Sequence, residues 1–158
     1  MKTLDFTKLD AAGATKTVTG LQQLLADYQL FYTNLRGFHW NIKGHAFFTL
    51  HAKFEELYDN AAEKVDEIAE RILMLGGVPA HNFSEYLKIS KVKETSYVSN
   101  ADECVKNILD TYAYLIAEER ELMELADNAN DEATAALMSD YIREQEKLVW
   151  MLVASATK

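Results

Sequence analysis

The sequence predicts an all-α fold, a four-helix bundle in which a long crossover joins the second and third helices. Four stretches carry apolar residues spaced alternately three and four apart, which is the period of one helix face, and strand-like alternation is absent. Two connections are short, so each should join antiparallel neighbours, whereas the third spans residues 76–100. We expect one domain over residues 1–158, with residues 1–16 as a short N-terminal tail.

The first two helices are predicted at about residues 17–43 and 47–75. Gly44 is the expected C-cap of the first helix, and Gly76, Gly77 and Pro79 end the second. The first apolar stripe consists of Val18, Leu21, Leu25, Tyr28, Tyr32, Leu35, His39 and Ile42. The second consists of His51, Phe54, Tyr58, Ala61, Val65, Ile68, Ile72 and Leu75. The short turn between the two helices predicts a hairpin.

The crossover and the second hairpin follow. Ser84 is the expected cap of a short helix over residues 85–89, since a connection of this length usually has a purpose. The third helix should begin at Asn100, with Glu103 completing a capping box. The fourth should run from Asn130 or Asp131 to about residue 153. Their stripes are Val105, Ile108, Tyr112, Leu115, Leu122 and Ala126, and then Leu137, Tyr141, Leu148 and Leu152.

Composition indicates a soluble protein of a reducing compartment. Hydrophobic residues make up 49% and charged residues 26%, and Cys104 is the only cysteine, so no disulfide forms within the chain. The first ten residues lack the apolar core of a signal peptide, and no apolar run is long enough to cross a membrane. We therefore expect a cytoplasmic protein with no membrane partner.

The charge disfavours DNA as a partner. The formal net charge is -9, and an acidic surface repels phosphates and attracts cations, although the charge can also serve solubility alone. The N-terminal segment offers Lys2, Lys8 and Lys16 against Asp5 and Asp10, which is a weak basic arm. DNA binding through such arms stays an alternative, which a gel-shift at low salt would test.

Two histidines lie on the apolar helix faces, on either side of the first turn. His39 is about five residues before the turn and His51 about four after the second helix begins, so antiparallel packing places them at similar height. Imidazole is a common ligand of iron, zinc and copper. Taken singly, each histidine fits a core residue better than a metal ligand, as in a structural or receptor-binding helical oligomer, whereas the facing pair fits both interpretations equally.

Two carboxylates, Asp66 and Glu70, lie on neighbouring turns of the second helix. Helical periodicity places them about 60° and about 100° around the axis from His51, beside the apolar stripe. The simpler interpretation is a solvated edge on which Lys64 or Arg71 pairs with them.

Helix geometry prevents one chain from bringing these groups together. His51 and Asp66 are fifteen residues apart on one helix, which is about 22 Å, whereas ligands lie about 2 Å from a metal. Either the residues are unrelated or two chains, antiparallel about a two-fold axis, share two identical sites. The usual site inside a ferritin bundle is excluded because no Glu-x-x-His occurs: Arg36, Ile42, Phe48 and Val78 precede the four histidines by three residues.

These segments resemble the signature of the Dps proteins, or mini-ferritins. The likeness rests on Phe38-His39-Trp40-Asn41-Ile42-Lys43-Gly44, on Leu50-His51, on Phe54-Glu55-Glu56-Leu57-Tyr58 and on Val65-Asp66-Glu67-Ile68-Ala69-Glu70-Arg71. Twelve residues separate His39 from His51, fifteen lead on to Asp66 and four more to Glu70. The similarity in helix pattern covers roughly residues 17–153.

The resemblance implies a ferritin-like bundle with a short crossover helix, assembled as a homo-oligomer, a hollow dodecamer. It implies iron as the metal, with no organic cofactor. His39 and His51 of one subunit would bind iron together with Asp66 and Glu70 of its two-fold mate, and Glu55 would lie near a second, weaker iron. The implied activity is that of a ferroxidase, which oxidises Fe(II) to Fe(III) with hydrogen peroxide or O2, stores the mineral and limits oxidative stress.

Some residues match the family less well. Trp40 resembles a tryptophan associated with electron transfer, but it and Trp150 are also explained as aromatics packed at a subunit interface. An acidic iron-entry pore is often found early in the fourth helix, where this chain has Ala133 and Ala136. The remaining acids that can line such a pore are Asp127, Asp131, Glu132 and Asp140, unless they only solvate the helix start.

Overall fold

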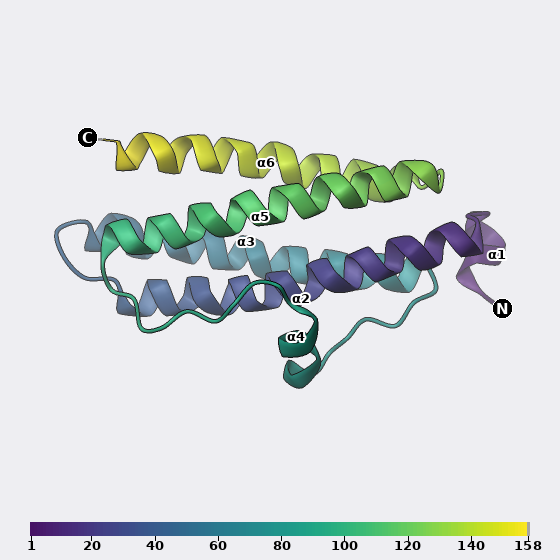
Figure 1. The fold of residues 1–158 in the computed structure, drawn as a ribbon, viewed down its shortest axis with the longest axis horizontal. Coiled ribbons are helices and arrows are strands. Elements are labelled where there is room, and N and C mark those ends of the chain that lie inside the picture. Colours follow the sequence, from purple (N-terminus) through teal and green to yellow (C-terminus); the bar gives the residue numbers. More distant parts are fainter. Residues whose placement is uncertain (158) are drawn as a thin grey trace.

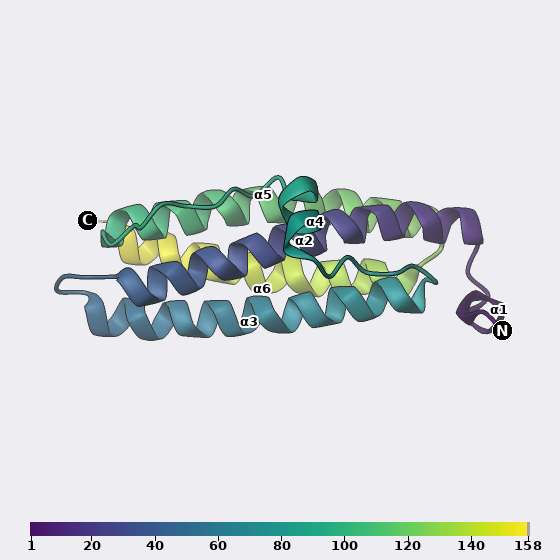
Figure 2. The same cartoon turned by 90° about the horizontal axis from the view of Figure 1, so that it is seen from below.

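A computed structural model describes residues 1–157, which form helices and no strand. The helices are α1 (Thr3–Thr7), α2 (Ala11–Asn41), α3 (Phe47–Met74), α4 (Phe83–Ile89), α5 (Ala101–Asn128) and α6 (Glu132–Ala156). Two antiparallel hairpins, α2–α3 and α5–α6, pack side by side, and α4 lies outside α2 (Figure 1). The turned view shows the crossover running along α2 and α5 (Figure 2). The predicted four-helix bundle with a crossover helix is confirmed.

The predicted apolar stripes meet in one core. Leu21, Leu25 and Leu35 of α2 and Ile68 and Ile72 of α3 are all at most 1% exposed. The second hairpin adds Ile108, Tyr112, Leu115, Tyr141 and Leu152. Full burial of one such side chain stabilises the fold by about 1.5–3 kcal/mol, so the core fixes how the hairpins face each other.

The N-terminal segment is not the tail that the sequence predicted. Residues Thr3–Thr7 form α1, and α2 begins at Ala11 rather than at residue 17. Asp10 caps α2, because its carboxylate accepts a hydrogen bond of 2.7 Å from the Gly13 backbone N–H. Alanines in the first turn favour the helix strongly enough to offset Gly13.

The starts of α4, α5 and α6 can be compared with the predicted helix starts. The crossover helix begins at Phe83, so Ser84 lies inside it, and Asn82 is its N-cap residue. The predicted start of α5 is confirmed, since the Asn100 side chain accepts a hydrogen bond of 3.0 Å from the Glu103 N–H, but the Glu103 carboxylate does not return the bond that a capping box requires. The prediction for α6 is also confirmed, with Asp131 as its cap.

The turn between α2 and α3 is tight, and it sets the position of the two histidines. The prediction that Gly44 is the C-cap of the first helix is wrong, because α2 ends at Asn41. Gly44 is a turn residue instead, with a φ of +103°, which favours glycine. The Phe47 N–H donates to the Gly44 carbonyl over 3.1 Å, and the Lys43 N–H donates to the Ser99 carbonyl over 3.1 Å. These bonds fix the hairpin end against the start of α5.

The long crossover is fastened to α2 by buried polar side chains. Asp27 is 0% exposed and accepts hydrogen bonds from Ser90 Oγ, the N–H groups of Lys91 and Val92, and Tyr114 Oη. The Gln22 amide donates to the Val78 carbonyl and accepts from the Ala80 N–H, and the Asn34 amide donates to the Lys93 carbonyl and accepts from the Thr95 N–H. The crossover therefore has a defined path, and α4 is fixed over α2.

Candidate metal centre

The two histidines meet where α2 ends and α3 begins. Their rings stack with centroids 3.8 Å apart and an angle of 19° between the planes. His39 is 8% exposed and His51 is half-buried. The prediction that antiparallel packing brings them to similar height is confirmed.

Reciprocal hydrogen bonds fix the orientation of both rings. His39 Nδ1 lies 2.7 Å from the His51 carbonyl oxygen, and His51 Nδ1 lies 2.8 Å from the His39 carbonyl oxygen. A carbonyl oxygen only accepts hydrogen bonds, so each Nδ1 carries the proton and donates it. In a neutral imidazole the lone pair then resides on Nε2, which is the state that a metal ligand requires.

Aromatic neighbours hold the histidine pair on both sides. Phe47 stacks on His51, with centroids 4.9 Å apart, and Tyr58 meets His39 edge to face at 5.3 Å. Such contacts favour one ring orientation over others. The pair is therefore a rigid, preorganised donor of two nitrogen ligands.

The predicted carboxylates lie further along α3, on its exposed surface. Asp66 and Glu70 are exposed and make no hydrogen bond or ion pair within residues 1–157. The cations considered as their partners are engaged elsewhere: Lys64 Nζ lies 2.6 Å from Glu144 Oε2, and an Arg71 guanidinium nitrogen lies 2.6 Å from Asp131 Oδ1. Both carboxylates are free to bind a cation from outside the subunit.

One subunit presents these ligands as two separate halves. Helix α3 is continuous from Phe47 to Met74, so His51 and Asp66 lie about 22 Å apart along its axis. Within the described chain, no three His, Cys, Asp or Glu side chains gather closely enough to hold a metal. Glu55, one turn after His51, is exposed as well. The structure thus brings His39 and His51 together and keeps Asp66 and Glu70 apart from them.

The bundle interior holds a carboxylate that sequence reasoning missed. Glu119 is 0% exposed, and its Oε1 accepts hydrogen bonds of 2.7 Å from Tyr28 Oη and from Gln145 Nε2. Burial raises the pKa of Glu119 to about 7. Glu119 and Gln145 occupy gaps in the predicted stripes, between Leu115 and Leu122 and between Tyr141 and Leu148. Those gaps were the signal that polar groups enter the core.

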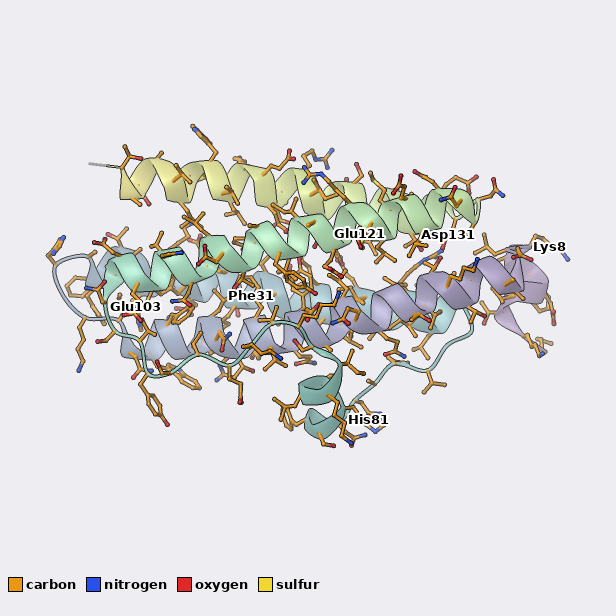
Figure 3. The ribbon with its side chains drawn as sticks, viewed as in Figure 1. Lys8, Phe31, His81, Glu103, Glu121 and Asp131 are labelled. Atoms are coloured by element: carbon orange, nitrogen blue, oxygen red, sulfur yellow. The ribbon has the colours of Figure 1, made fainter. Side chains whose placement is uncertain are left out.

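Trp40 and the acids at the α5–α6 turn complete the set of predicted residues. Trp40 is 64% exposed, with the Arg36 guanidinium 4.6 Å above its ring. Asp131 lies at the same end of the bundle as Lys8 (Figure 3), but it is 2% exposed and bonded to Thr134 and Arg71. It is therefore unavailable to a pore, which leaves Asp127, Glu132 and Asp140, all of them exposed.

Known proteins match the chain over almost its whole length. A family model described as a ferritin-like domain matches residues 18–158. An uncharacterized protein of Haemophilus influenzae is 55% identical over 147 residues, covering 93% of this chain and 92% of that protein. A DNA protection during starvation protein of Porphyromonas gingivalis is 51% identical over 157 residues and covers 99% of each chain.

A solved structure agrees with the sequence matches. The crystal structure of a Dps protein from Vibrio cholerae O1, described as a member of a superfamily of ferritin-like diiron-carboxylate proteins, superposes with a TM-score of 0.93 at 50% identity. The match covers 94% of both chains. No helix within residues 1–157 is both long and apolar enough to span a membrane.

Proposed function

Because the chain belongs to the Dps family of ferritin-like proteins, an assignment that supports an iron-binding protein of stress protection and a homo-oligomer, we propose that it is a ferroxidase. It binds Fe(II) between two subunits, oxidises it to Fe(III) with hydrogen peroxide, and stores the product inside a dodecameric shell. O2 is the alternative oxidant, and no organic cofactor takes part. Two Fe(II), one peroxide and two protons give two Fe(III) and two water molecules.

The reciprocal bonds between His39 and His51 carry the proposal. They fix two Nε2 atoms on a rigid stacked pair, ready to accept a metal. A histidine with a purely structural role in the core would use both ring nitrogens in hydrogen bonds and would leave no Nε2 available to a metal. Two imidazoles alone fill only part of an iron coordination sphere.

The partner subunit supplies the remaining ligands. In a two-fold pair with antiparallel α3 helices, the Asp66 and Glu70 end of one subunit faces the histidine end of the other. Carboxylates stabilise the harder Fe(III), which favours oxidation after binding. Glu55 stands one turn from His51 and would contact a second, more weakly held iron.

Mixing two defective subunits tests the shared site. One variant carries His39→Ala and His51→Ala, and the other carries Asp66→Ala and Glu70→Ala. Neither oligomer alone has an intact site, so both should lose Fe(II) oxidation. The reaction is monitored by the absorbance of Fe(III) after peroxide is added. In a pair made of one subunit of each kind, one of the two sites is intact. Unfolded and refolded together in equal amounts, the variants should therefore recover about a quarter of the sites.

Matched controls separate the site from general surface effects. His81 and Glu121 are exposed residues of the same types on other parts of the fold, so a His81→Ala and Glu121→Ala variant should oxidise iron as the unaltered protein does. Two results would contradict the proposal. One is full activity in either site variant alone, and the other is no recovery in mixed oligomers that native mass spectrometry shows to have formed.

DNA binding is not part of the proposal. The lysines of the N-terminal segment do not form an extended arm, since Lys2 and Lys8 flank α1 and Lys16 lies within α2. The acidic net charge of -9 is multiplied in an oligomer and opposes the approach of phosphates.

A further inference from the structure

A tyrosine lies in direct contact with the candidate metal centre. The ring of Tyr58 meets the ring of His39 edge to face, with centroids 5.3 Å apart and 83° between the planes. Tyr32 continues the series, with its ring centroid 6.0 Å from that of Tyr58. Both tyrosines are half-buried, and Tyr58 Oη makes no hydrogen bond within residues 1–157. Tyr58 is therefore an oxidisable group one ring away from a metal ligand.

Peroxide reduction requires a second electron donor when only one Fe(II) is bound. Peroxide takes up two electrons on its way to water, and each Fe(II) gives one. A site that holds a single strongly bound iron would stop after one electron and release hydroxide and a hydroxyl radical. A nearby phenol that gives the second electron prevents this release whenever the weaker second iron is absent.

Tyr58 is better placed for this task than Trp40. Adjacent residues on a helix do not face the same side, and Trp40 follows His39 directly. The Arg36 guanidinium lies 4.6 Å from the centroid of the Trp40 ring and 5.8 Å from that of Tyr58. An indole radical cation would face this positive charge, whereas a phenol that loses its proton on oxidation forms a neutral radical. Arg36 also donates a hydrogen bond of 3.1 Å to Tyr32 Oη, which withdraws electron density from that phenol.

We propose that Tyr58 supplies the second electron to peroxide when only one Fe(II) occupies the shared site. This inference rests on the proposed ferroxidase function. One Fe(II), one Tyr58 phenol, one peroxide and one proton give one Fe(III), one neutral tyrosyl radical and two water molecules. The O–O bond breaks, iron and the phenol are oxidised, and the phenolic proton leaves to solvent. A later Fe(II), with a proton, restores the phenol and becomes Fe(III).

Electron paramagnetic resonance tests the proposal in the assembled protein. Fe(II) is added at less than one per site, followed by peroxide, and samples are frozen rapidly. We expect an organic radical whose signal narrows when the protein contains ring-deuterated tyrosine. The signal should be lost in Tyr58→Phe and kept in the matched variants Tyr32→Phe and Trp40→Phe. The amount of hydroxyl radical caught by an added spin trap should increase in Tyr58→Phe and not in the other two variants.

The outcomes distinguish this inference from the proposed function. Tyr58→Phe keeps the ring that packs on His39, and an unchanged Co(II) absorption spectrum would show that the metal ligands remain in place. Fe(II) oxidation without a tyrosyl radical, or with a radical that persists in Tyr58→Phe, overturns the inference and leaves the ferroxidase function standing. Absence of any Fe(II) oxidation by the unaltered protein overturns both.

Discussion

At the centre of the bundle, Glu119 accepts hydrogen bonds from Tyr28 and Gln145, whereas at the hairpin end His39 and His51 keep their Nε2 atoms unused. Both regions place polar groups among apolar residues. In the centre, the groups come from α2, α5 and α6 of one chain and bond to each other. At the hairpin end, the groups bond to backbone carbonyls through Nδ1, and no hydrogen bond within residues 1–157 uses their Nε2 atoms.

The difference separates stability from metal binding. A charge in the centre loses hydration and must be compensated by neighbours, so substitutions there should change the free energy of unfolding and its dependence on pH. Under the proposed function, the ligands at the hairpin end are completed by another subunit. Substitutions of ligand atoms there should change iron binding with little effect on the stability of the subunit.

The largest effect on stability is expected at the ion pair of Lys64 and Glu144. The Lys64 side chain is 4% exposed and that of Glu144 is 44% exposed. Glu144→Ala leaves a buried ammonium group without its carboxylate and should destabilise the protein by about 3 kcal/mol. Lys64→Met removes the buried charge, and Glu144 can turn to water, so it should cost about 1 kcal/mol.

Urea unfolding of both variants measures this asymmetry. Iron binding should stay unchanged in each of them, because Lys64 and Glu144 pair within the subunit and neither is a proposed iron ligand. Equal losses of stability in the two variants would show that the ammonium group is not effectively buried.

The next largest effect is a pH dependence that Glu119 causes. Its carboxyl group titrates at 4.5 when unfolded and at about 7 when folded, so its contribution to stability is full below 4.5 and lost as the pH rises through 7. From about pH 5 to about pH 8 the protein should lose roughly 2–3 kcal/mol of stability from this group.

Glu119→Gln isolates that contribution. The amide cannot ionise, and its oxygen still accepts from Tyr28 and Gln145. The variant should match the unaltered protein in urea near pH 5 and exceed it near pH 8. Glu121→Gln, an exposed neighbour on α5, is the control and should keep the original pH profile. A Glu119→Gln profile parallel to that of Glu121→Gln would show that Glu119 titrates normally.

Sequence periodicity predicted the hairpins and the meeting of the two histidines, because both follow from helix spacing and antiparallel packing. Sequence periodicity could not predict the hydrogen bonds from each Nδ1 to the other residue's carbonyl, since these depend on side-chain rotation about two bonds. The hairpin turn shows the same limit, because a glycine near a helix end fits both a C-cap and the turn position that Gly44 occupies.

The bundle centre was predicted less well. Its stripes were identified from apolar residues, so Glu119 and Gln145 were passed over although their spacing fits the stripes. Asp27 was missed for another reason: it pairs with residues of the crossover more than sixty positions away, and no local pattern encodes such a contact. The predicted tail failed because the cap at Asp10 lies before the apolar periodicity begins.

The smallest effect is expected at Glu55, which sharpens the comparison on the side of the hairpin. Glu55 is exposed and makes no ion pair within residues 1–157. Glu55→Gln therefore removes one negative charge near the proposed second iron and should leave stability unchanged. Calorimetric titration with Fe(II) under anaerobic conditions should show the first binding event unaltered and the second weakened by about tenfold or less. Glu121→Gln serves as the control, since Glu121 is an exposed acid on α5, which contributes no proposed ligand. If Glu55→Gln weakened the first event as strongly as the second, Glu55 would belong to the main ligand set, and the hairpin end would hold more of the site than two histidines.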